Sequence, residues 1–395
     1  MRDKYKLKIL FVSHDASRTG APIVLLHLLR WLKTNKNIEL TILLKDAGEL
    51  EAEFRNTAPT YSLINSFVPS HNMLIRGVKK IARKLSLQPQ SKKYIIPKPL
   101  QNQTYDIIYL NTVVSLNLAS LLKQHYNCPV VAHIHENDFT INYYYPNSLE
   151  LENINAVDHF IAVSNSTKYN LIENYYIAAD KISLVYECID TERVRKPNLN
   201  KIREIKQELS LDNEFVVGGS GLTSWRKGVD LFVQLAVALN RLRPSNTIKL
   251  VWVGAISREF QFHFLYECER LQIKDKVIFS GSKPNPEDYF QLFSVFSLTS
   301  REDPFPLVVL EAAAQAKPII CFEKSGGIPE LLSEGGGILV PYGNVQAMAE
   351  QVLYLYDHPE IKNAMGRDIE REVQKFDVNV VGVQILKVLN DVLSR

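Results

Sequence analysis

Two carboxylates in residues 300–330 are spaced so that they could bind hydroxyl groups. Asp303, with Glu302 beside it, precedes a proline-rich turn, and Glu311 lies in an otherwise apolar helix expected over 307–316. A carboxylate on such a helix needs a partner that donates hydrogen bonds. The vicinal hydroxyls of a sugar or ribose provide one, and so does a Lys or Arg from a neighbouring element. Both interpretations are open at this point.

Two adjacent cations, Arg226 and Lys227, end a glycine-rich loop over 218–228 that follows an expected strand. Backbone amides and cationic side chains together can neutralise a diphosphate without a metal. The loop begins like a dinucleotide fingerprint, but Ser224 occupies the place of the third glycine. We predict a phosphate site here, and the alternative is a solvated basic turn.

Two histidines, His133 and His135, precede Glu136 and share one face of an expected strand, because side chains on a strand alternate. A metal site, a structural histidine and a contact to substrate are the three interpretations. The sequence indicates no third ligand, and no two aspartates stand one residue apart to bind a divalent ion. We therefore predict no metal and no cofactor, and we favour a contact between His135 and substrate.

The elements that must position these residues alternate between strand and helix. Strands are expected at residues 8–13, 39–44, 107–110, 130–135, 159–163 and 182–186, and again at 215–218, 249–254, 277–280, 295–299, 319–322 and 338–340. Near-continuous apolar runs are typical of parallel strands covered on both faces, so each half is expected to form a doubly wound α/β sheet. The polar stretch 190–200 is the expected linker, and Asp377 is the expected N-cap of a last helix.

These motifs resemble the donor site of retaining glycosyltransferases of the family-four type. Asp303 and Glu311 are separated by seven residues, whereas the family usually has glutamate at both positions. Residues 224–230 resemble its Arg-Lys-Gly segment, and residues 19–22 resemble its glycine loop. The resemblance implies a GT-B fold, in which two Rossmann-like domains face a cleft. Residues 1–195 would bind the acceptor, 196–376 would bind the nucleotide-sugar donor, and the helix in 377–395 would cross back to the N-terminal domain.

The resemblance also implies a role for each site residue. Arg226 and Lys227 would stabilise the leaving diphosphate, Asp303 would hold the sugar, and His135 would contact it. The remaining donor-binding residues would be Glu311 on the ribose, the Leu307 and Val308 amides, Phe305, Glu302 as a second carboxylate, Gly20, and Ser282 and Lys283 near the base. Tyr143 and Tyr144 are expected to line the acceptor site.

The expected reaction moves a sugar from a nucleotide-diphosphate sugar to a saccharide or a lipid-linked acceptor. The resemblance implies retention of anomeric configuration and no strict need for a metal. One alternative is a non-catalytic protein of the same fold that binds nucleotide sugars. Another is a nucleotide-sugar epimerase, for which the sequence offers no acid–base pair beyond His135 and Glu136.

Charge is distributed unevenly along the chain. Residues 54–105 contain nine Lys or Arg and no Asp or Glu, so the rest of the chain is net acidic. Within this segment, residues 74–93 combine an apolar helical face with a basic one, which predicts binding to an anionic membrane surface. The alternative is a helix that covers the sheet, and sparse aromatics argue against nucleic acid.

Four scattered cysteines and the lack of a long apolar run predict reduced thiols and no membrane-spanning helix. We expect a cytoplasmic protein that is peripheral on the inner face of the membrane.

Overall fold

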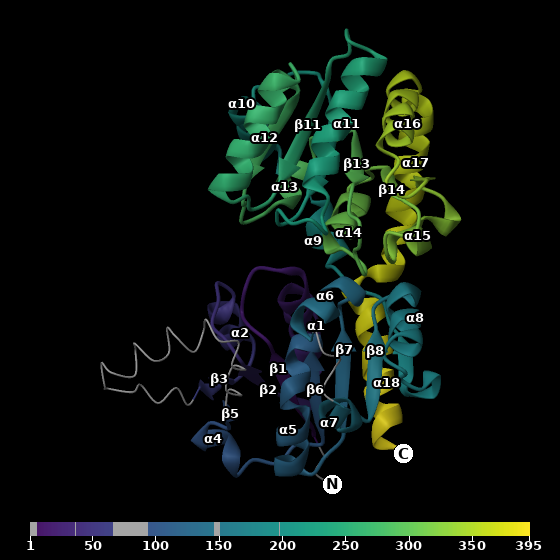
Figure 1. Cartoon of the computed structure of the whole chain (residues 1–395). Helices are drawn as coiled ribbons and strands as arrows, with labels where there is room; N and C mark the ends of the chain where they lie inside the picture. Colours follow the sequence, from purple (N-terminus) through teal and green to yellow (C-terminus); the bar gives the residue numbers. More distant parts are fainter. Residues whose placement is uncertain (1–5, 36, 66–93, 146–150, 197) are drawn as a thin grey trace, which may run out of the picture.

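The structure is a computed structural model of the chain, and it describes residues 6–35, 37–65, 94–145, 151–196 and 198–395. The predicted membrane-binding segment 74–93 lies outside the described residues. Two parallel sheets form, one in each half of the chain, with helices packed around them (Figure 1). This arrangement confirms the two doubly wound domains predicted from the apolar strands.

The N-terminal sheet is parallel, and its strand order is β3-β2-β1-β6-β7-β8-β9. Its strands are β1 (Leu7–Ser13), β2 (Ile38–Leu44), β3 (Thr60–Ser62), β6 (Ile107–Asn111), β7 (Val130–Ile134), β8 (His159–Ala162) and β9 (Ile182–Leu184). A separate antiparallel pair joins β4 (Ile64–Asn65) to β5 (Tyr94–Ile95). The helices are α1 (Gly20–Lys33), α2 (Glu51–Thr57), α4 (Lys98–Gln101), α5 (Ala119–Tyr126), α6 (Asp138–Tyr144), α7 (Leu151–Asn155) and α8 (Asn165–Glu173), with a 3₁₀ turn over Val113–Leu118.

The C-terminal sheet is also parallel, and its order is β12-β11-β10-β13-β14-β15. Its strands are β10 (Phe215–Ser220), β11 (Ile248–Val253), β12 (Val277–Gly281), β13 (Val295–Leu298), β14 (Ile319–Phe322) and β15 (Gly337–Val340). The helices are α9 (Thr191–Arg195), α10 (Leu199–Glu208), α11 (Val229–Leu242), α12 (Arg258–Arg270), α13 (Glu287–Phe290), α14 (Leu307–Ala314), α15 (Ile328–Leu331), α16 (Val345–Asp357), α17 (Pro359–Glu372) and α18 (Val378–Leu393).

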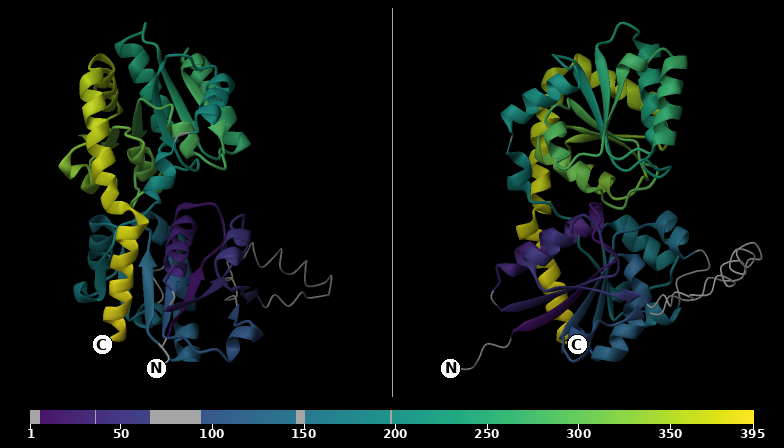
Figure 2. Two further views of the ribbon diagram at one scale, coloured as in Figure 1. Left: turned by 180° about the vertical axis from the view of Figure 1, so that it is seen from behind. Right: turned by 90° about the vertical axis from the view of Figure 1, so that its left-hand side faces the viewer.

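The direction of strand addition reverses once in each sheet, between β1 and β6 and between β10 and β13. At such a switch point the following loops turn to opposite faces, so a crevice opens at the carboxyl ends of the strands. Figures 1 and 2 show the two halves one above the other, with these loop-bearing edges facing each other. The fold therefore brings the loops after β1, β6, β10 and β13 to one place.

Residues 190–200, the predicted linker, contain a short helix. Helix α9 forms within them, and Asp190 caps it by accepting a hydrogen bond from the Arg193 amide at 2.9 Å. Helix α10 then begins at Leu199. The linker and the domain boundary between residues 195 and 196 stay predictions.

The last helix crosses back to the N-terminal half, as expected for a GT-B fold. Asp377 caps α18 by accepting from the Asn379 amide at 2.8 Å. Gly382 of α18 lies against Trp31 of α1, where an added Cβ would stand 2.6 Å from the indole ring. The helix thus fits α1 only because this position has no side chain.

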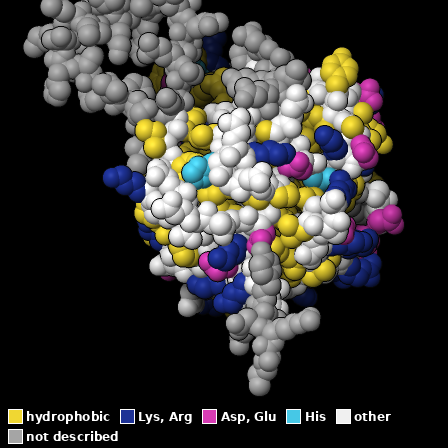
Figure 3. Space-filling view, turned by 90° about the horizontal axis from the view of Figure 1, so that it is seen from below, with side chains coloured by type: hydrophobic (Ala, Val, Ile, Leu, Met, Phe, Trp, Pro, Cys, Tyr) yellow, Lys and Arg dark blue, Asp and Glu magenta, His cyan; other side chains and the backbone are white. Residues whose placement is uncertain are grey.

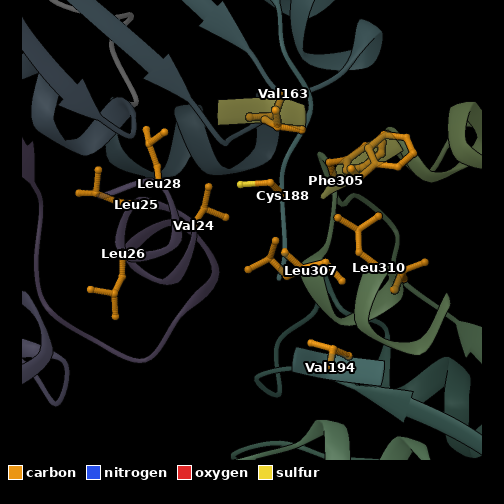
Figure 4. Packing of buried hydrophobic residues seen from close by; sticks show 14 of the residues in the cluster. Val24, Leu25, Leu26, Leu28, Val163, Cys188, Val194, Phe305, Leu307 and Leu310 are labelled. Atoms are coloured by element: carbon orange, nitrogen blue, oxygen red, sulfur yellow. The ribbon is translucent and has the colours of Figure 1, made fainter. Parts of the chain in front are cut away.

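One apolar cluster runs from α1 through α14 to α18. Figure 4 shows part of it, with Leu307 and Leu310 on one side and residues of α1 on the other. Phe305 anchors the cluster, since its ring centroid lies 5.0 Å from Tyr186 and 5.2 Å from Phe376. The segment that carries the predicted donor residues is therefore held against both halves of the chain.

On the face of the molecule shown in Figure 3, apolar, basic and acidic side chains are mixed where the described atoms are visible. Among the described residues, no helix combines the length and the apolar character needed to cross a membrane.

Candidate active site

Three charged side chains meet at the switch point of the C-terminal sheet. The loop after β10 supplies Arg226 and Lys227, and the loop after β13 supplies Asp303. Arg226 Nη1 lies 3.0 Å from Asp303 Oδ1, and Lys227 Nζ lies 2.5 Å from Asp303 Oδ2. Ser300 donates a further hydrogen bond to Asp303 Oδ2 at 3.0 Å. Both carboxylate oxygens of Asp303 are therefore occupied.

Burial and mutual attraction shift the pKa values of the charged groups in this cluster. Burial opposes the ionisation of Asp303, but Lys227 and Arg226 outweigh it and hold the pKa of that carboxyl below its usual range. Burial also lowers the pKa of the Lys227 ammonium, against the opposite pull of Asp303. One carboxylate thus faces two cations, and the cluster keeps one net positive charge.

The backbone around Asp303 is fixed by the loop after β14. The Asp303 amide donates to the Ser325 carbonyl at 2.6 Å. Gly326, which follows Ser325, has φ +132°, and an added Cβ would stand 1.8 Å from the Asp303 carbonyl oxygen. Glycine is needed at this position for both reasons, since L side chains rarely adopt that conformation.

Helix α14 begins beside the charged cluster and carries Glu311 one turn further on. Glu311 is 8% exposed, and its Oε2 atom has no hydrogen-bond partner among the described residues. Burial, with a further contribution from Glu287, raises the pKa of the Glu311 carboxyl to about 8. Arg193 lowers the pKa of Glu311, but its guanidinium pairs with Glu287 at 2.7 Å. Glu311 therefore has a buried oxygen, and no Lys or Arg in the part of the chain that the structure describes is hydrogen-bonded to it.

A chain of hydrogen bonds crosses the switch point of the N-terminal sheet. Asn111 Nδ2, at the end of β6, donates to the Ala21 carbonyl in the first turn of α1 at 3.0 Å. Asn111 Oδ1 lies 2.8 Å from His135 Nε2, and His135 Nδ1 lies 2.6 Å from Glu187 Oε1. The side chains of His135 and Glu187 are 4% and 6% exposed.

The direction of this chain fixes the protons. Because the Asn111 amide nitrogen donates to Ala21, its oxygen accepts, and His135 Nε2 must carry the hydrogen. Burial lowers the pKa of His135 to about 3, so Nδ1 has a lone pair and needs a donor. Burial raises the pKa of Glu187 to about 8, which favours a protonated carboxyl as that donor. Burial thus favours the neutral form of both groups.

The Glu187→Gln variant tests this proton assignment. The folded protein keeps a Glu187 proton that the unfolded chain loses near pH 4.5, so this stabilisation is complete below pH 4.5 and is lost as pH rises through 8. A glutamine donates to His135 without ionising. We expect the variant to match wild type at pH 5 and to be more stable by about 1–3 kcal/mol at pH 8 in urea unfolding.

Two controls accompany this measurement. Glu187→Leu leaves His135 Nδ1 without a donor and should lose about 1–3 kcal/mol at pH 5, and less at pH 8, because leucine also avoids the ionisation that destabilises wild type there. The exposed Glu192→Gln variant should follow wild type throughout. A Glu187→Gln protein that is clearly less stable than wild type at pH 8 would mean that Glu187 is ionised beside a charged His135.

Two glutamates join the halves of the chain across the cleft. Glu330 of α15 accepts from the Asn165 amide at 3.0 Å and the Ser166 amide at 3.2 Å, at the start of α8, and from the Tyr186 hydroxyl at 2.9 Å. Glu302 accepts from the Phe139 amide in the first turn of α6 at 3.2 Å. Carboxylates are favourable at helix N-termini, where amides lack partners.

A cavity of about 780 Å³ opens between the halves, next to Glu302. The lining residues come from α6 and α8 on one side and from the loops after β10, β13, β14 and β15 on the other: Asn137, Asp138, Phe139, Asn142, Tyr143, Ser166, Trp225, Arg301, Glu302, Lys324, Gly326 and Tyr342. Among the described residues, no group of three or more His, Cys, Asp or Glu side chains is placed to hold a metal ion.

Two family models match the chain, one in each half. The model described as Glycosyltransferase Family 4 matches residues 18–193, and the model described as Glycosyl transferases group 1 matches residues 200–372. The second match contains Arg226, Lys227, Asp303 and Glu311. The chain belongs to the family 4 glycosyltransferases.

Individual relatives in this family are distant. The lipopolysaccharide core biosynthesis mannosyltransferase LpsB of Rhizobium meliloti is 28% identical over 209 residues, which are 50% of this chain and 57% of that protein. A UDP-Gal:alpha-D-GlcNAc-diphosphoundecaprenol alpha-1,3-galactosyltransferase of Escherichia coli is 21% identical over 353 residues, 87% of this chain and 86% of that protein. The chain spans 57–63% of the length of the first three curated relatives it matches.

Several solved structures share the architecture of this chain. The Anabaena protein HepE, in complex with UDP and glucose, superposes with a TM-score of 0.77 at 22% identity and covers 97% of this chain and 99% of its own. WaaG, a glycosyltransferase involved in lipopolysaccharide biosynthesis, superposes with a TM-score of 0.67 at 12% identity and covers 96% of this chain and 99% of its own. These likenesses show that the fold is GT-B.

Several of the site residues predicted from the sequence lie close together in the structure. The fold brings Arg226, Lys227 and Asp303 into contact and places the start of α14 in the same loop region. Gly20 begins α1, and the space where its side chain would be is open. The placement is as expected, and the roles of these residues stay predictions.

Three predicted contacts meet partners that the sequence did not indicate. Asp303 has both oxygens on Arg226, Lys227 and Ser300, so a sugar would have to share them. His135 has both ring nitrogens bonded, so a sugar contact would have to replace one partner. Phe305 is 3% exposed, and its ring packs on Tyr186 and Phe376, so only its backbone is free to serve a donor.

The residues predicted for the base and the acceptor lie at the edges of the site. Lys283 follows β12, where it pairs with Glu208 at 2.7 Å and lies over the Tyr289 ring, and the neighbouring Ser282 is exposed. Tyr143 is 74% exposed and lines the cavity, whereas Tyr144 is not among the lining residues. Of this pair, the structure supports only Tyr143 as a lining residue.

Sequence reasoning missed Glu187, Asn111, Glu330 and Trp225. Glu187 and Asn111 stand at or just beyond the ends of β9 and β6, so the strand-end rule that selected His135 could have selected them too. Trp225 directly precedes the predicted cation Arg226 in the chain, and Glu330 is the last residue of the segment 300–330. No sequence signal showed that either one reaches the opposite half.

Proposed function

We propose that this protein transfers a sugar from a nucleotide-diphosphate sugar to a saccharide or lipid-linked acceptor, with retention of anomeric configuration and without a strict metal requirement. The observation that carries the proposal is the partly buried pair of Arg226 and Lys227, both in contact with Asp303 in the loop that leads into α14. Relatives named for diphosphoundecaprenol substrates support a lipid-linked acceptor. The HepE complexes with UDP and UDP-glucose support a nucleotide-sugar donor.

The mechanism follows from where negative charge grows. When the bond between sugar and phosphate breaks, its electron pair stays on the diphosphate, and the acceptor hydroxyl forms the new bond and passes its proton to the leaving diphosphate. Cations and amides that already point at the diphosphate stabilise the transition state more than the bound donor. Arg226, Lys227 and the Leu307 and Val308 amides fill this role, and Pro306 cannot because it has no N–H.

Glu311 is the proposed ribose ligand. Two ribose hydroxyls donate hydrogen bonds best to an ionised carboxylate, whereas burial raises the pKa of the empty Glu311 to about 8. Nucleotide binding at pH 7 should therefore release a proton from Glu311. Proton release on binding would therefore report that the nucleotide contacts the Glu311 carboxyl.

A panel of nucleoside diphosphates tests the donor site. At 100 times its Kd, a ligand should stabilise the folded protein by about 2.7 kcal/mol, which thermal unfolding detects. For the best ligand, calorimetry at pH 7 in two buffers of different ionisation enthalpy should show release of up to one proton. Glu311→Gln should weaken binding about 10–100-fold and abolish the release, because a hydrogen bond to a charged group is lost.

The exposed Glu259→Gln variant on α12 is the control and should bind as wild type does. If Glu311→Gln binds nucleotide normally, the ribose assignment is wrong. Donor turnover separates the functions: binding without sugar release would indicate a non-catalytic module, and an altered free nucleotide sugar would indicate an epimerase.

A further inference from the structure

The cavity between the two halves is lined by aromatic rings that solvent reaches. The exposed fractions are 74% for Tyr143, 57% for Trp225, 52% for Tyr342 and 43% for Phe139. Four exposed rings around one hollow are unusual, because large apolar side chains gathered on a surface mark a binding site more often than a packing defect. Concave sites lined by aromatic rings with a few polar groups are typical of small-ligand sites.

Two of these rings come from opposite halves and are packed together. The ring centroids of Phe139 and Trp225 lie 5.0 Å apart, with planes tilted by 31°. The Arg301 guanidinium lies 5.1 Å above the Trp225 ring and is fixed by Asp230 at 2.6 Å. The indole is therefore held in place from one side while more than half of its surface stays open.

The polar groups of the cavity include both hydrogen-bond acceptors and donors. The carboxylates of Asp138 and Glu302 are acceptors, and the cationic side chains of Arg301 and Lys324 are donors. Glu302 Oε2 accepts from the Phe139 amide at 3.2 Å, and Asp138 accepts from Asn142 at 2.9 Å and from Tyr175 at 3.0 Å. Such a lining suits a ligand with several hydroxyl groups, because a hydroxyl both donates and accepts hydrogen bonds.

The cavity adjoins the leaving-group cluster but is separate from the proposed ribose site. Trp225 precedes Arg226 and Glu302 precedes Asp303, and Arg226 Nη1 donates to the Glu302 carbonyl at 2.8 Å. Neither Glu311 nor any residue of α14 lines the cavity. A ring bound here would therefore lie next to the diphosphate but away from the nucleoside.

We propose that this cavity binds a pyranose ring of the acceptor, with one face of the sugar against Trp225 and Tyr143 and its hydroxyls toward the polar side chains of the lining. This inference rests on the proposed function and adds that the C-terminal half supplies part of the acceptor site. The polarised C–H bonds of a pyranose face suit the negative face of an aromatic ring, while its hydroxyls suit carboxylate acceptors.

Saturation-transfer NMR tests the inference with defined probes. The probes are methyl glucoside, methyl galactoside, methyl mannoside and methyl N-acetylglucosaminide, each in the pyranose form and mixed with UDP and the full chain. We expect at least one pyranoside to receive saturation, mainly at the hydrogens of one ring face. Trp225→Ala and Tyr143→Ala should each lower that signal at least fivefold, and Trp225→Phe should keep most of it.

Tyr266→Ala is the matched control, because Tyr266 is 58% exposed on α12 and does not line the cavity. Its pyranoside signal should equal that of wild type. If UDP receives saturation and no pyranoside does, or if Trp225→Ala and Tyr143→Ala leave the pyranoside signal unchanged, the cavity is not a sugar site, although the proposed transferase function stands. If neither UDP nor any other nucleoside diphosphate binds, the proposed function fails first.

Discussion

The Lys227→Ala variant should turn over donor about 10²–10³-fold more slowly than wild type, because removing one preorganised charge from a developing anion costs that much. The Lys227 side chain is only 14% exposed and contacts Asp303, so little water can replace its charge. The effect should appear in kcat rather than in the affinity for acceptor, since the diphosphate gains charge only as the bond breaks. Release of nucleoside diphosphate from the best donor measures it.

Arg243→Ala provides the matched control for this loss of charge. Arg243 pairs with Asp357 on the surface at 2.7 Å, away from both switch points. Its removal should leave turnover within about twofold, because exposed ion pairs contribute little. A Lys227→Ala enzyme that turns over at a near wild-type rate would overturn the leaving-group assignment.

The Asp303→Asn variant should lose about 3–5 kcal/mol of stability, because it leaves two buried or half-buried cations without a counter-charge. Burial already lowers the pKa of Lys227, and without Asp303 nothing nearby opposes that shift. Turnover should therefore fall together with stability. Urea unfolding at pH 7 measures the first effect, and donor turnover at 10 °C, where the variant stays folded, measures the second.

Asp357→Asn removes the carboxylate of the exposed Arg243 pair and is the appropriate comparison. It should cost about 1 kcal/mol or less. The double variant Asp303→Asn, Lys227→Met should regain much of the lost stability, because it removes one of the uncompensated charges. If Asp303→Asn costs no more than Asp357→Asn, the buried cluster is not the electrostatic unit described above.

Sequence predicted the sheets well because parallel strands leave a strong local signal. Each of the twelve expected strands forms, and β3, β4 and β5 were missed because they are two or three residues long. Helices α10 and α17, for which no expectation was stated, are rich in charged residues and bury few side chains: Ile205 in α10, and Gly366 and Ile369 in α17.

The candidate site was predictable as a set of loops but not as a set of contacts. The strand-end rule selected Arg226, Lys227, His135 and Asp303, and topology placed their loops at the switch points. Which oxygen meets which nitrogen depends on side-chain directions that no spacing encodes. The sequence thus paired Asp303 with a sugar, whereas the structure pairs it with the cations of the neighbouring loop.

The exposure of Trp225 in the cavity could not be predicted from the sequence either. An aromatic residue in a basic loop gives no sign of its exposure, because exposure depends on the distance to the opposite half. The ring of Phe139 is about eighty-six positions away in the chain and yet 5.0 Å away in space. Only the relative placement of two independently folded sheets brings these rings together.

Glu330 has a kinetic consequence. The hydrogen bonds described for its carboxylate all come from the opposite half, from Asn165, Ser166 and Tyr186. Separating the halves by even a few ångströms would break these hydrogen bonds at the same time. Opening of the cleft is then a single activated step, in which this set of hydrogen bonds acts as a latch. The residence time of a spent nucleotide would then depend on how often this latch opens.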